Sequence, residues 1–527
     1  MAGNVVNLDA MIPREDMAEV FDTRVGNQER IDIHHLDDNF FGEALRKPDF
    51  QRETAHWSPE KVVDLIRSFV DGDLIPAVIL WKRAGNVFVI DGAHRLGALI
   101  AWVRDDYGDQ RKSSEYFGGR IPEEQRRIAE QVRKTVNALI GPYGEFASAR
   151  KNPQNARPEI QARLANLAVN TIVAQWVPAV DAKAAESSFF KINQAATPID
   201  PTERRILKSR ASPNAVAARA IVRGGTGHKY WTKYASDVQA EIEQIAKHVH
   251  SALYEPPIGD GPVKTLDLPL AGRGYNALPF VFDLVNWANA VPEPKGQKET
   301  DGIDPDVDGS QTIKFLKAVK RAIDLLTGNA PMSLGLHPAV YCYTRGGEFQ
   351  PAALLAVAEF ISALEKKGQL KTFAAVRRAL EDFLIQHKDF ITLTIKKTGA
   401  GKRSQPRIVR YVQFVAERLA EGLSDGQIVS ALEGDDEFSY LQGASAPSIR
   451  LSEAPTGAHG KAMGKSTKSA SFLNAALQSP VRCALCGGLI HKNSIQIDHV
   501  KRKEDGGGGD MKNAQVVHPF CNSTLKN

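Results

Sequence analysis

Three of the four cysteines in this 527-residue chain lie near its C-terminal end, at the spacing of metal ligands. Cys483 and Cys486 form one pair, and His518 and Cys521 form a second pair with the same two-residue gap. Two such pairs on tight turns can complete a tetrahedral zinc site with sulfur and nitrogen ligands. We therefore predict a structural zinc ion bound by three cysteines and one histidine. The alternative is a set of buried cysteines that bind no metal.

An acid and a histidine lie between these two pairs, at the end of a short strand pattern. Asp498 and His499 close the pattern of residues 495–500, and Asn522 follows the last cysteine. Carboxylate and amide oxygens are suitable ligands for Mg²⁺, and an imidazole can accept a proton from water near neutral pH. Hydrolysis of a phosphodiester needs such a base, together with a cation beside the developing negative charge. The pattern therefore predicts phosphodiester hydrolysis with Mg²⁺ or Mn²⁺.

This segment resembles the zinc-bound form of the HNH endonuclease family, whose site lies on a ββα-metal finger. The matching residues are Cys483, Cys486, Asp498, His499, Gly506, Gly507, Asn513, His518, Cys521 and Asn522. The resemblance implies that His499 is the general base and that Asp498 and Asn522 bind the catalytic metal. It also implies that Asn513 pins the intervening loop. The family usually has a second cysteine pair here, so His518 is either a zinc ligand or the last catalytic histidine. A zinc finger that only binds DNA is the alternative.

Charge and composition suit a globular protein that binds a polyanion. The net charge is +5, and residues 461–527 hold ten Lys or Arg against four Asp or Glu, a surplus of six. We expect Lys501, Arg502 and Lys503 to contact DNA phosphates, because cationic side chains supply much of the affinity for nucleic acid. The sequence shows no apolar run long enough for a membrane span and no signal-peptide pattern at its start. These features predict a cytoplasmic protein that does not bind a membrane.

The N-terminal part of the chain predicts an α/β domain. Ser58 and Pro59 are typical of a helix start, and the apolar spacing after them is helical. Strand patterns cover residues 77–81, 87–90 and 171–177. A mostly helical insertion is expected over residues 105–165. The strand at 87–90 runs directly into Asp91, Gly92 and a helix that carries Arg95 in its first turn. Such a turn can bind an anion through backbone amides and the guanidinium, although solvated charges on a β-turn are the alternative.

Roughly residues 30–210 resemble the ParB/sulfiredoxin-like N-terminal domain of the GmrSD type IV restriction enzymes, a layout shared with SspE-like phage-defence proteins. The resemblance rests on residues 50–57, 90–96 and 189–203. It implies binding or hydrolysis of an NTP and sensing of DNA state. The residues implied to share one pocket are Gln51, Arg52, Asp91, Gly92, His94, Arg95 and Asn193. Ala93 stands where the family usually has Gln, which leaves open whether a nucleotide is hydrolysed or only bound.

The rest of the chain predicts helices and one linker. Helical periodicity covers residues 233–250, 312–327, 351–366, 372–386 and 407–421. We therefore expect an α+β multidomain protein. Its expected parts are a ParB/sulfiredoxin-like α/β domain at 1–210, an all-α domain at 211–451, a flexible linker at 452–470 and an HNH domain with a ββα-metal zinc finger at 471–527.

These features together predict a metal-dependent DNA endonuclease of bacterial restriction or phage defence. Its N-terminal domain is expected to bind a nucleotide or sense DNA and thereby license cutting. The expected cofactors are structural Zn²⁺, catalytic Mg²⁺ or Mn²⁺ and an NTP, and the expected partner is DNA, modified or not, with a homo-oligomer left open. One alternative is a ParB-like, nucleotide-switched DNA-binding protein whose finger only binds DNA. Another is a mobile-element nuclease whose front domain only positions DNA.

Overall fold

The chain forms two compact units in this computed structural model. They are Met1–Glu243 with Pro292–Thr312, and Gln244–Val291 with Ile313–Asn527. The residues that the structure describes are 5–15, 28–37, 40–51, 57–83, 85–119, 121–178, 181–195, 201–259, 261–272, 277–292, 302–399, 401–442 and 463–526. The units follow other boundaries than the expected domains, because residues 211–243 belong to the first unit and the C-terminal segment belongs to the second.

The first unit is built on a six-stranded mixed sheet with strand order β1-β3-β5-β4-β6-β2. The strands are β1 (Arg14–Glu15), β2 (Arg30–Ile31), β3 (Leu45–Pro48), β4 (Val78–Arg83), β5 (Asn86–Asp91) and β6 (Ile172–Trp176). β4 and β5 form an antiparallel hairpin, β5 pairs parallel with β3, and β4 pairs parallel with β6. The strands predicted at 77–81, 87–90 and 171–177 are therefore confirmed.

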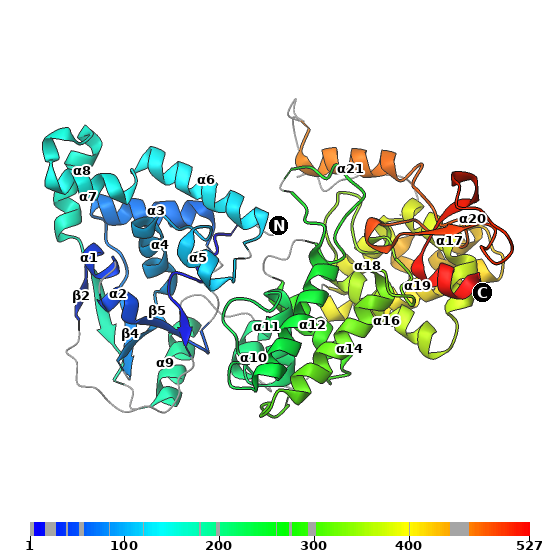
Figure 1. Cartoon of the computed structure of the whole chain (residues 1–527), viewed down its shortest axis with the longest axis horizontal. Coiled ribbons are helices and arrows are strands. Elements are labelled where there is room, and N and C mark those ends of the chain that lie inside the picture. Colours follow the sequence, from blue (N-terminus) through cyan, green and yellow to red (C-terminus); the bar gives the residue numbers. More distant parts are fainter. Residues whose placement is uncertain are drawn as a thin grey trace. The chain divides into compact units, whose positions relative to one another are not determined.

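Helices cover both faces of this sheet because its central strands alternate their apolar side chains between two cores. On β5, Val87 and Val89 point into the larger core, whereas Phe88 and Ile90 point into a smaller core with Phe189. Figure 1 shows α3 (Pro59–Asp71) and α4 (Ala93–Arg104) on one side of the sheet and α9 (Ala182–Ala195) on the other. The first turn of α4, which follows β5 directly, therefore lies at an edge of both cores.

The remaining helices of the first unit include the predicted insertion. They are α1 (Ile33–Leu36), α2 (Phe40–Ala44), α5 (Arg111–Tyr116), α6 (Glu123–Leu139), α7 (Tyr143–Lys151), α8 (Pro158–Val169), α10 (Pro201–Lys208) and α11 (Pro213–Val222). α3 begins at Pro59 with Ser58 as its N-cap residue, as predicted, but the Ser58 side chain makes no capping hydrogen bond. α6 and α8 pack on α3, which confirms the helical insertion over 105–165.

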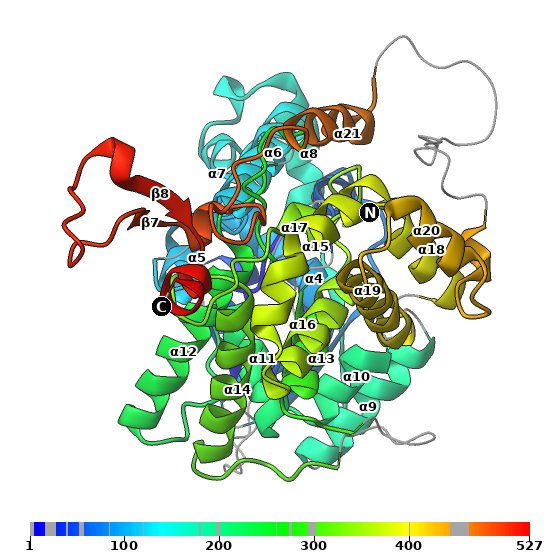
Figure 2. The same cartoon turned by 90° about the vertical axis from the view of Figure 1, so that its right-hand side faces the viewer.

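The second unit is a helical bundle that carries the C-terminal segment. Its helices are α13 (Leu278–Ala288), α15 (Pro338–Tyr341), α16 (Pro351–Lys366), α17 (Leu370–Gln386), α18 (Asp389–Thr398), α19 (Gln405–Ala420), α20 (Asp425–Glu433) and α21 (Lys465–Ala476), with most of α12 (Ser236–Tyr254) and α14 (Ser310–Leu326). The five helical stretches predicted here are confirmed as α12, α14, α16, α17 and α19. Figure 2 shows α16 in the middle of the bundle, where it packs on α13, α17 and α19.

The C-terminal segment has two strands followed by a helical turn, where a ββα finger was expected. The antiparallel strands β7 (Gln496–His499) and β8 (Ala514–Val517) form a hairpin that stands out from the helices in Figure 2. A single π-helical turn, η6 (Cys521–Leu525), follows β8. A bridge between Arg482 and Leu489 closes the turn that carries the first cysteine pair. We call residues 482–489 the knuckle.

Part of the predicted linker is helical. Residues 465–470 form the first half of α21, whereas residues 452–462 lie outside the described residues. α21 is held in the second unit because Leu473 is buried and the Ser469 hydroxyl accepts a hydrogen bond of 2.9 Å from the Val263 amide. Within the described part of the chain, no helix combines the length and apolar character that a membrane span requires.

Candidate active site and zinc cluster

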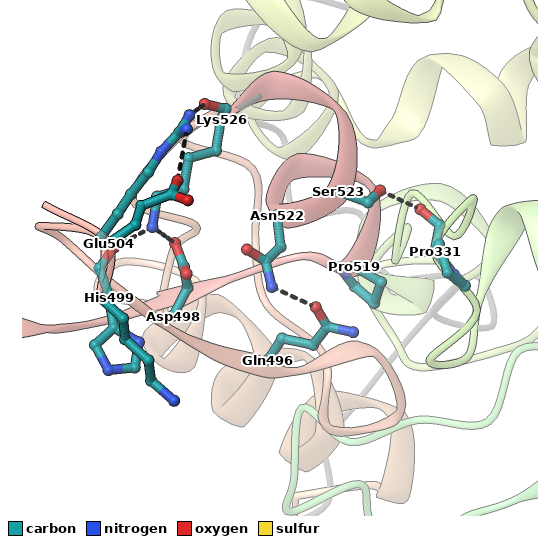
Figure 3. Close-up of a pocket in the computed structure, with 11 residues that line it drawn as sticks. Pro331, Gln496, Asp498, His499, Glu504, Pro519, Asn522, Ser523 and Lys526 are labelled. Carbon is teal, nitrogen blue, oxygen red and sulfur yellow. Dashed lines mark hydrogen bonds and ion pairs between the residues drawn. The ribbon is translucent and has the colours of Figure 1, made fainter. Parts of the chain in front are cut away.

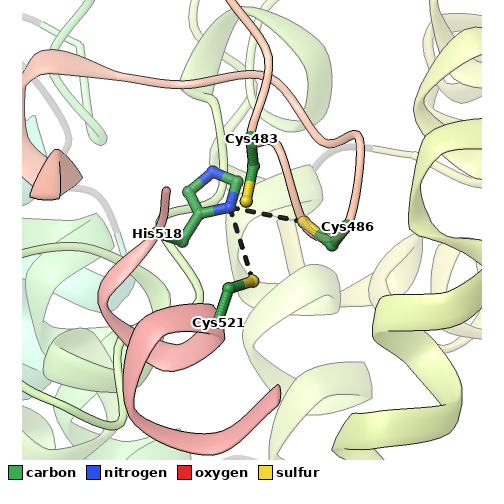
Figure 4. Close-up of side chains that lie close together, drawn as sticks. All are labelled: Cys483, Cys486, His518 and Cys521. Carbon is green, nitrogen blue, oxygen red and sulfur yellow. Dashed lines mark hydrogen bonds between the residues drawn. The ribbon is translucent and has the colours of Figure 1, made fainter. Parts of the chain in front are cut away.

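Four buried side chains converge at the base of the hairpin. Cys483 and Cys486 come from the knuckle, whereas His518 and Cys521 come from the end of β8 and the start of η6 (Figure 4). Their ligand atoms all lie within 4.8 Å of one another. This set of three sulfurs and one nitrogen fits a tetrahedral Zn²⁺ site. The structure therefore places His518 beside the three thiols, as its expected role as a zinc ligand requires.

The orientation of the His518 ring also fits a metal ligand. Its Nε2 lies 3.0 Å from the Leu489 carbonyl oxygen, to which it donates a hydrogen bond. Its Nδ1 then carries the lone pair and lies 3.4 Å from the Cys486 sulfur and 3.9 Å from the Cys521 sulfur. A ligand imidazole is commonly held by a carbonyl on its other nitrogen in this manner.

The thiols cannot all ionise without a cation. A hydrogen bond with Cys486 holds the pKa of Cys483 well below its usual range, whereas a hydrogen bond with Cys483 raises the pKa of Cys521 far above it. One thiolate therefore forms at the expense of its neighbours, because like charges destabilise each other in a buried site. A bound Zn²⁺ would compensate two of the three negative charges and so allow the thiolates to lie side by side. The pKa shifts of Cys483 and Cys521 thus agree with the metal-ligand geometry of the cluster.

A pocket of about 550 Å³ lies beside η6, and it brings the predicted catalytic residues together. Asp498, His499 and Asn522 all line it, with Arg502 and Lys503 from the basic loop. In the view of Figure 3, Asp498 stands between His499 and Asn522. The remaining lining residues are Pro331, Gln496, Glu504, Pro519, Ser523 and Lys526. The pocket therefore combines an imidazole, oxygen ligands and cations on one surface.

Hydrogen bonds orient both candidate ligands of the catalytic metal. Asp498 Oδ2 lies 2.6 Å from the Lys526 ammonium and accepts a hydrogen bond of 3.1 Å from Gln515, its partner across the hairpin. The Asn522 Nδ2 donates to Gln496 Oε1 at 2.8 Å, which leaves the amide oxygen as the atom that can bind a metal. Partial burial opposes ionisation of Asp498, but the hydrogen bonds from Lys526 and Gln515 outweigh it and lower its pKa. Asp498 is therefore a carboxylate at neutral pH.

The oxygen atoms of this pocket suit a hard cation. The Lys526 ammonium donates to the His499 carbonyl oxygen as well as to Asp498. The Lys526 ammonium thus lies between the Asp498 carboxylate and the His499 carbonyl oxygen, and both oxygens are of the type that Mg²⁺ prefers as ligands. The donor set at Asp498 and Asn522 therefore fits a divalent metal ion.

Asn513 fixes the loop that follows β7. Its Nδ2 donates to the carbonyl oxygens of Lys501 at 3.0 Å and Gly508 at 2.7 Å, and its Oδ1 accepts from the Lys501 amide at 2.7 Å. Gly507 approaches this loop so closely that a Cβ would overlap the Lys501 carbonyl oxygen. Lys501 and Lys503 are exposed, whereas Arg502 donates to the Lys526 carbonyl oxygen at 2.6 Å. Two of the three basic side chains are thus presented to solvent.

The expected N-terminal pocket is only partly described. Arg52 lies outside the described residues, and Asn193 lies on the last turn of α9. Gln51 is buried beside the end of β5, where its Nε2 donates to the Ile90 carbonyl oxygen at 3.4 Å. Its Oε1 has no hydrogen-bond partner among the described residues. A buried amide oxygen without a partner is costly, and a ligand donor would satisfy it.

The turn from β5 into α4 has the predicted backbone form. Gly92 has a φ of +99°, and a Cβ there would clash with Val78. Arg95 does not point its whole guanidinium at an anion, because its Nη2 donates to Asp91 at 2.7 Å and to the Ala77 carbonyl oxygen at 3.1 Å. The Arg95 Nε is buried without a partner in the described part of the chain.

The His94 ring lies at the same turn. It stacks on Trp57, with ring centroids 5.4 Å apart and an interplanar angle of 21°. Asp91 ends β5, His94 and Arg95 lie in the first turn of α4, and Gln51 lies next to them through its bond to Ile90.

Several residues of these sites belong to no motif of the sequence. Lys526 and Gln515 hold Asp498, and the pair Arg377 and Glu381 on α17 packs against the zinc cluster. The alternation of β8 could have identified Gln515, because it lies opposite Asp498 on the same face. The spacing of Arg377 and Glu381 is that of an ordinary surface ion pair on a helix, so their burial was not predictable.

The Cys3His cluster and the adjoining pocket with Asp498, His499 and Asn522 agree with the resemblance to HNH endonucleases. Family comparison agrees, because residues 483–527 match the HNH endonuclease model. Residues 33–211 match the model of the GmrSD restriction endonuclease N-terminal domain. The chain thus combines a region similar to the N-terminal domain of GmrSD restriction endonucleases with a C-terminal region similar to HNH endonucleases. No curated protein and no solved structure matches the chain significantly.

Proposed function

We propose that this nuclease cuts DNA in a metal-dependent reaction and that its N-terminal domain controls cutting in defence against phage. The observation that carries the proposal is the pocket lined by Asp498, His499 and Asn522 beside the Cys3His cluster. A finger that only binds DNA has no need of a carboxylate, a base and an amide oxygen in one pocket. The match of residues 483–527 to the HNH endonuclease model also favours an enzyme over a finger that only binds DNA.

In the proposed reaction, His499 accepts the proton of the attacking water. Asp498 and Asn522 hold the catalytic metal, which when bound supplies positive charge beside the scissile phosphate. Gln515 and Lys526 keep Asp498 ionised and oriented. The basic side chains at the rim bind the flanking phosphates.

The most direct test is a cleavage assay with purified full-length protein. Unmodified plasmid and modified phage DNA are incubated with and without Mg²⁺ and with and without NTPs. We expect no cleavage without a divalent metal. We also expect the rate on one of the DNA substrates to depend on the nucleotide. Cleavage that is unaffected by NTPs on every DNA would instead favour a nuclease whose front domain only positions DNA.

The N-terminal domain is proposed to be a ParB/sulfiredoxin-like module that binds a nucleotide. Its mixed sheet, the glycine turn before α4 and the unpartnered buried amide oxygen of Gln51 support a ligand at this edge. The turn presents backbone amides of a twelve-residue helix, α4, together with Arg95. Both features favour a phosphate-bearing ligand.

Replacing Arg95 with alanine is expected to weaken nucleotide binding, because a planar guanidinium on phosphate is hard to replace. The decrease in affinity is to be measured by calorimetry with the full-length protein. Arg95→Lys is the matched control, since it keeps the charge but lacks the fork, and its affinity should fall between those of the wild type and the alanine variant. If the wild-type protein itself shows no nucleotide binding, the pocket does not act as a nucleotide switch.

Neutralising the exposed lysines of the basic loop should flatten the salt dependence of DNA binding. Removing one phosphate contact reduces the slope of log K against log salt by about 0.9. We expect the double variant Lys501→Ala, Lys503→Ala to bind DNA more weakly at every salt concentration with a smaller slope. The double variant Lys366→Ala, Lys367→Ala removes the same charge from the exposed end of α16 and should leave the slope unchanged. Equal slopes for both variants would exclude the loop from DNA binding.

A further inference from the structure

A charged pair on α17 is fully buried against the zinc cluster. The side chains of Arg377 and Glu381 are 1% and 0% exposed, and Arg377 Nε lies 2.7 Å from Glu381 Oε1. Neither side chain lines the cleavage pocket. A buried ion pair often contributes little to the stability of a fold, because desolvation offsets the attraction. Its contacts therefore have to be considered for another role.

Glu381 reaches the residue that orients a zinc ligand. Its Oε2 accepts a hydrogen bond of 2.6 Å from the Leu489 amide. The carbonyl oxygen of the same Leu489 accepts the hydrogen bond from His518 Nε2 at 3.0 Å. The Tyr341 hydroxyl donates to the other carboxylate oxygen at 3.1 Å and helps to hold it in place. The position of the His518 ring thus depends on Glu381 through one residue of the knuckle.

Arg377, the other member of the pair, contacts the cluster directly. Its Nη1 lies 3.4 Å from His518 Nδ1 and donates to the Leu334 carbonyl oxygen, while its Nη2 donates to the Gly335 carbonyl oxygen at 3.0 Å. A Cβ at Gly488 would overlap the guanidinium, and one at Gly335 would lie 2.7 Å from His518 Cδ2. Because Gly335 and Gly488 lack a Cβ, the loop that contains Leu334, the Arg377 guanidinium and the knuckle can pack in direct contact.

The charge of the filled cluster explains why a guanidinium is suited to this place. Three thiolates and one Zn²⁺ leave a single negative charge in a buried site. A cation that lies between this charge and the Glu381 carboxylate interacts favourably with both. An apolar side chain of the same volume would fill the space but would leave the thiolates uncompensated on that side.

We propose that Arg377 and Glu381 are positioning residues of the zinc cluster, so that α17 determines how firmly the HNH segment retains its zinc. Glu381 holds the knuckle and His518 in ligand geometry, and Arg377 compensates the thiolate charge. Partners that orient metal ligands typically change metal affinity by roughly 10–100-fold. The proposal concerns the zinc site and does not depend on how DNA is cut.

The test compares zinc release from full-length variants at a temperature well below their unfolding. In the double variant Arg377→Met, Glu381→Leu, apolar side chains replace the pair, a change that is often neutral or stabilising for the fold. We expect at least about tenfold faster transfer of zinc to a chromogenic chelator. We also expect the sulfur-to-metal charge-transfer band of the Co²⁺-substituted protein to move to lower energy, because the thiolates lack their neighbouring cation.

A matched control removes an exposed pair from the same unit. Arg321 and Glu365 lie 3.1 Å apart, and the arginine side chain is 70% exposed. The variant Arg321→Met, Glu365→Leu should retain the wild-type release rate and cobalt spectrum. Wild-type release and an unshifted band in the Arg377, Glu381 variant would overturn the proposal. If that variant does not fold, the milder Glu381→Gln decides the question by the same two measurements, since it keeps the shape but weakens the bond to Leu489.

Discussion

Replacing His499 with alanine is expected to abolish nearly all DNA cleavage while DNA binding and zinc content stay at wild-type levels. His499 lines the pocket, and an imidazole is the commonest general base for such a proton transfer. Loss of a general base typically costs on the order of 10²–10⁴ in rate. The rate is to be measured as plasmid nicking under single-turnover conditions, with DNA binding measured on the same preparation. Nicking at the wild-type rate would show that His499 is not the base.

Asn522→Ala provides the comparison for this result. It removes a proposed metal ligand but leaves the base in place, so we expect a smaller decrease in rate that high metal concentration partly restores. His499→Ala should not respond to added metal, because its defect lies in proton transfer. The two variants therefore separate the role of the base from that of the ligand. The same response to metal in both variants would contradict the assignment.

Replacing Cys486 with serine is expected to remove zinc and to lower the thermal stability of the second unit. Structural zinc sites contribute apparent binding energies of about 10–16 kcal/mol to folding, and a serine hydroxyl cannot replace a thiolate ligand. Zinc content is to be measured by metal analysis and unfolding by calorimetry.

Cys342 supplies the matched control for this substitution. It is the free, buried cysteine of the second unit that lies outside the cluster. Cys342→Ser should cost some stability by burying a hydroxyl but should retain zinc. Unchanged zinc content in the Cys486 variant would refute the metal assignment.

Much of this architecture was predictable because local patterns and buried faces agree. The apolar run from Val87 to Ile90 predicts a strand, and the structure places its side chains alternately in two cores. The helical spacing at 351–366 corresponds to α16 residue for residue, because a central helix carries apolar side chains on most of its surface. The two metal-ligand pairs could be identified from spacing alone, since few other arrangements require it.

The rest depends on contacts between segments that are distant in the sequence. Arg377 and Glu381 have the spacing of a solvated pair, and only the packing of the knuckle on α17 makes them buried. Lys526 reaches Asp498 across 28 residues of chain. Residues 465–470 have the composition of a linker, but Leu473 and Ser469 attach the helix that they begin to the second unit.

The C-terminal segment is joined to the helical bundle by its backbone as well as by its Cys3His cluster. The Phe520 amide donates to the Ser333 carbonyl oxygen at 3.0 Å, and the Ser523 hydroxyl donates to the Pro331 carbonyl oxygen at 2.8 Å. Both donors flank Asn522, and Pro331 itself lines the pocket. The nuclease is therefore not an exchangeable cassette. A transplant into another protein would have to include the loop between α14 and α15 together with α17. Without that loop, the turn η6 that carries Asn522 would lack the carbonyl groups that hold it.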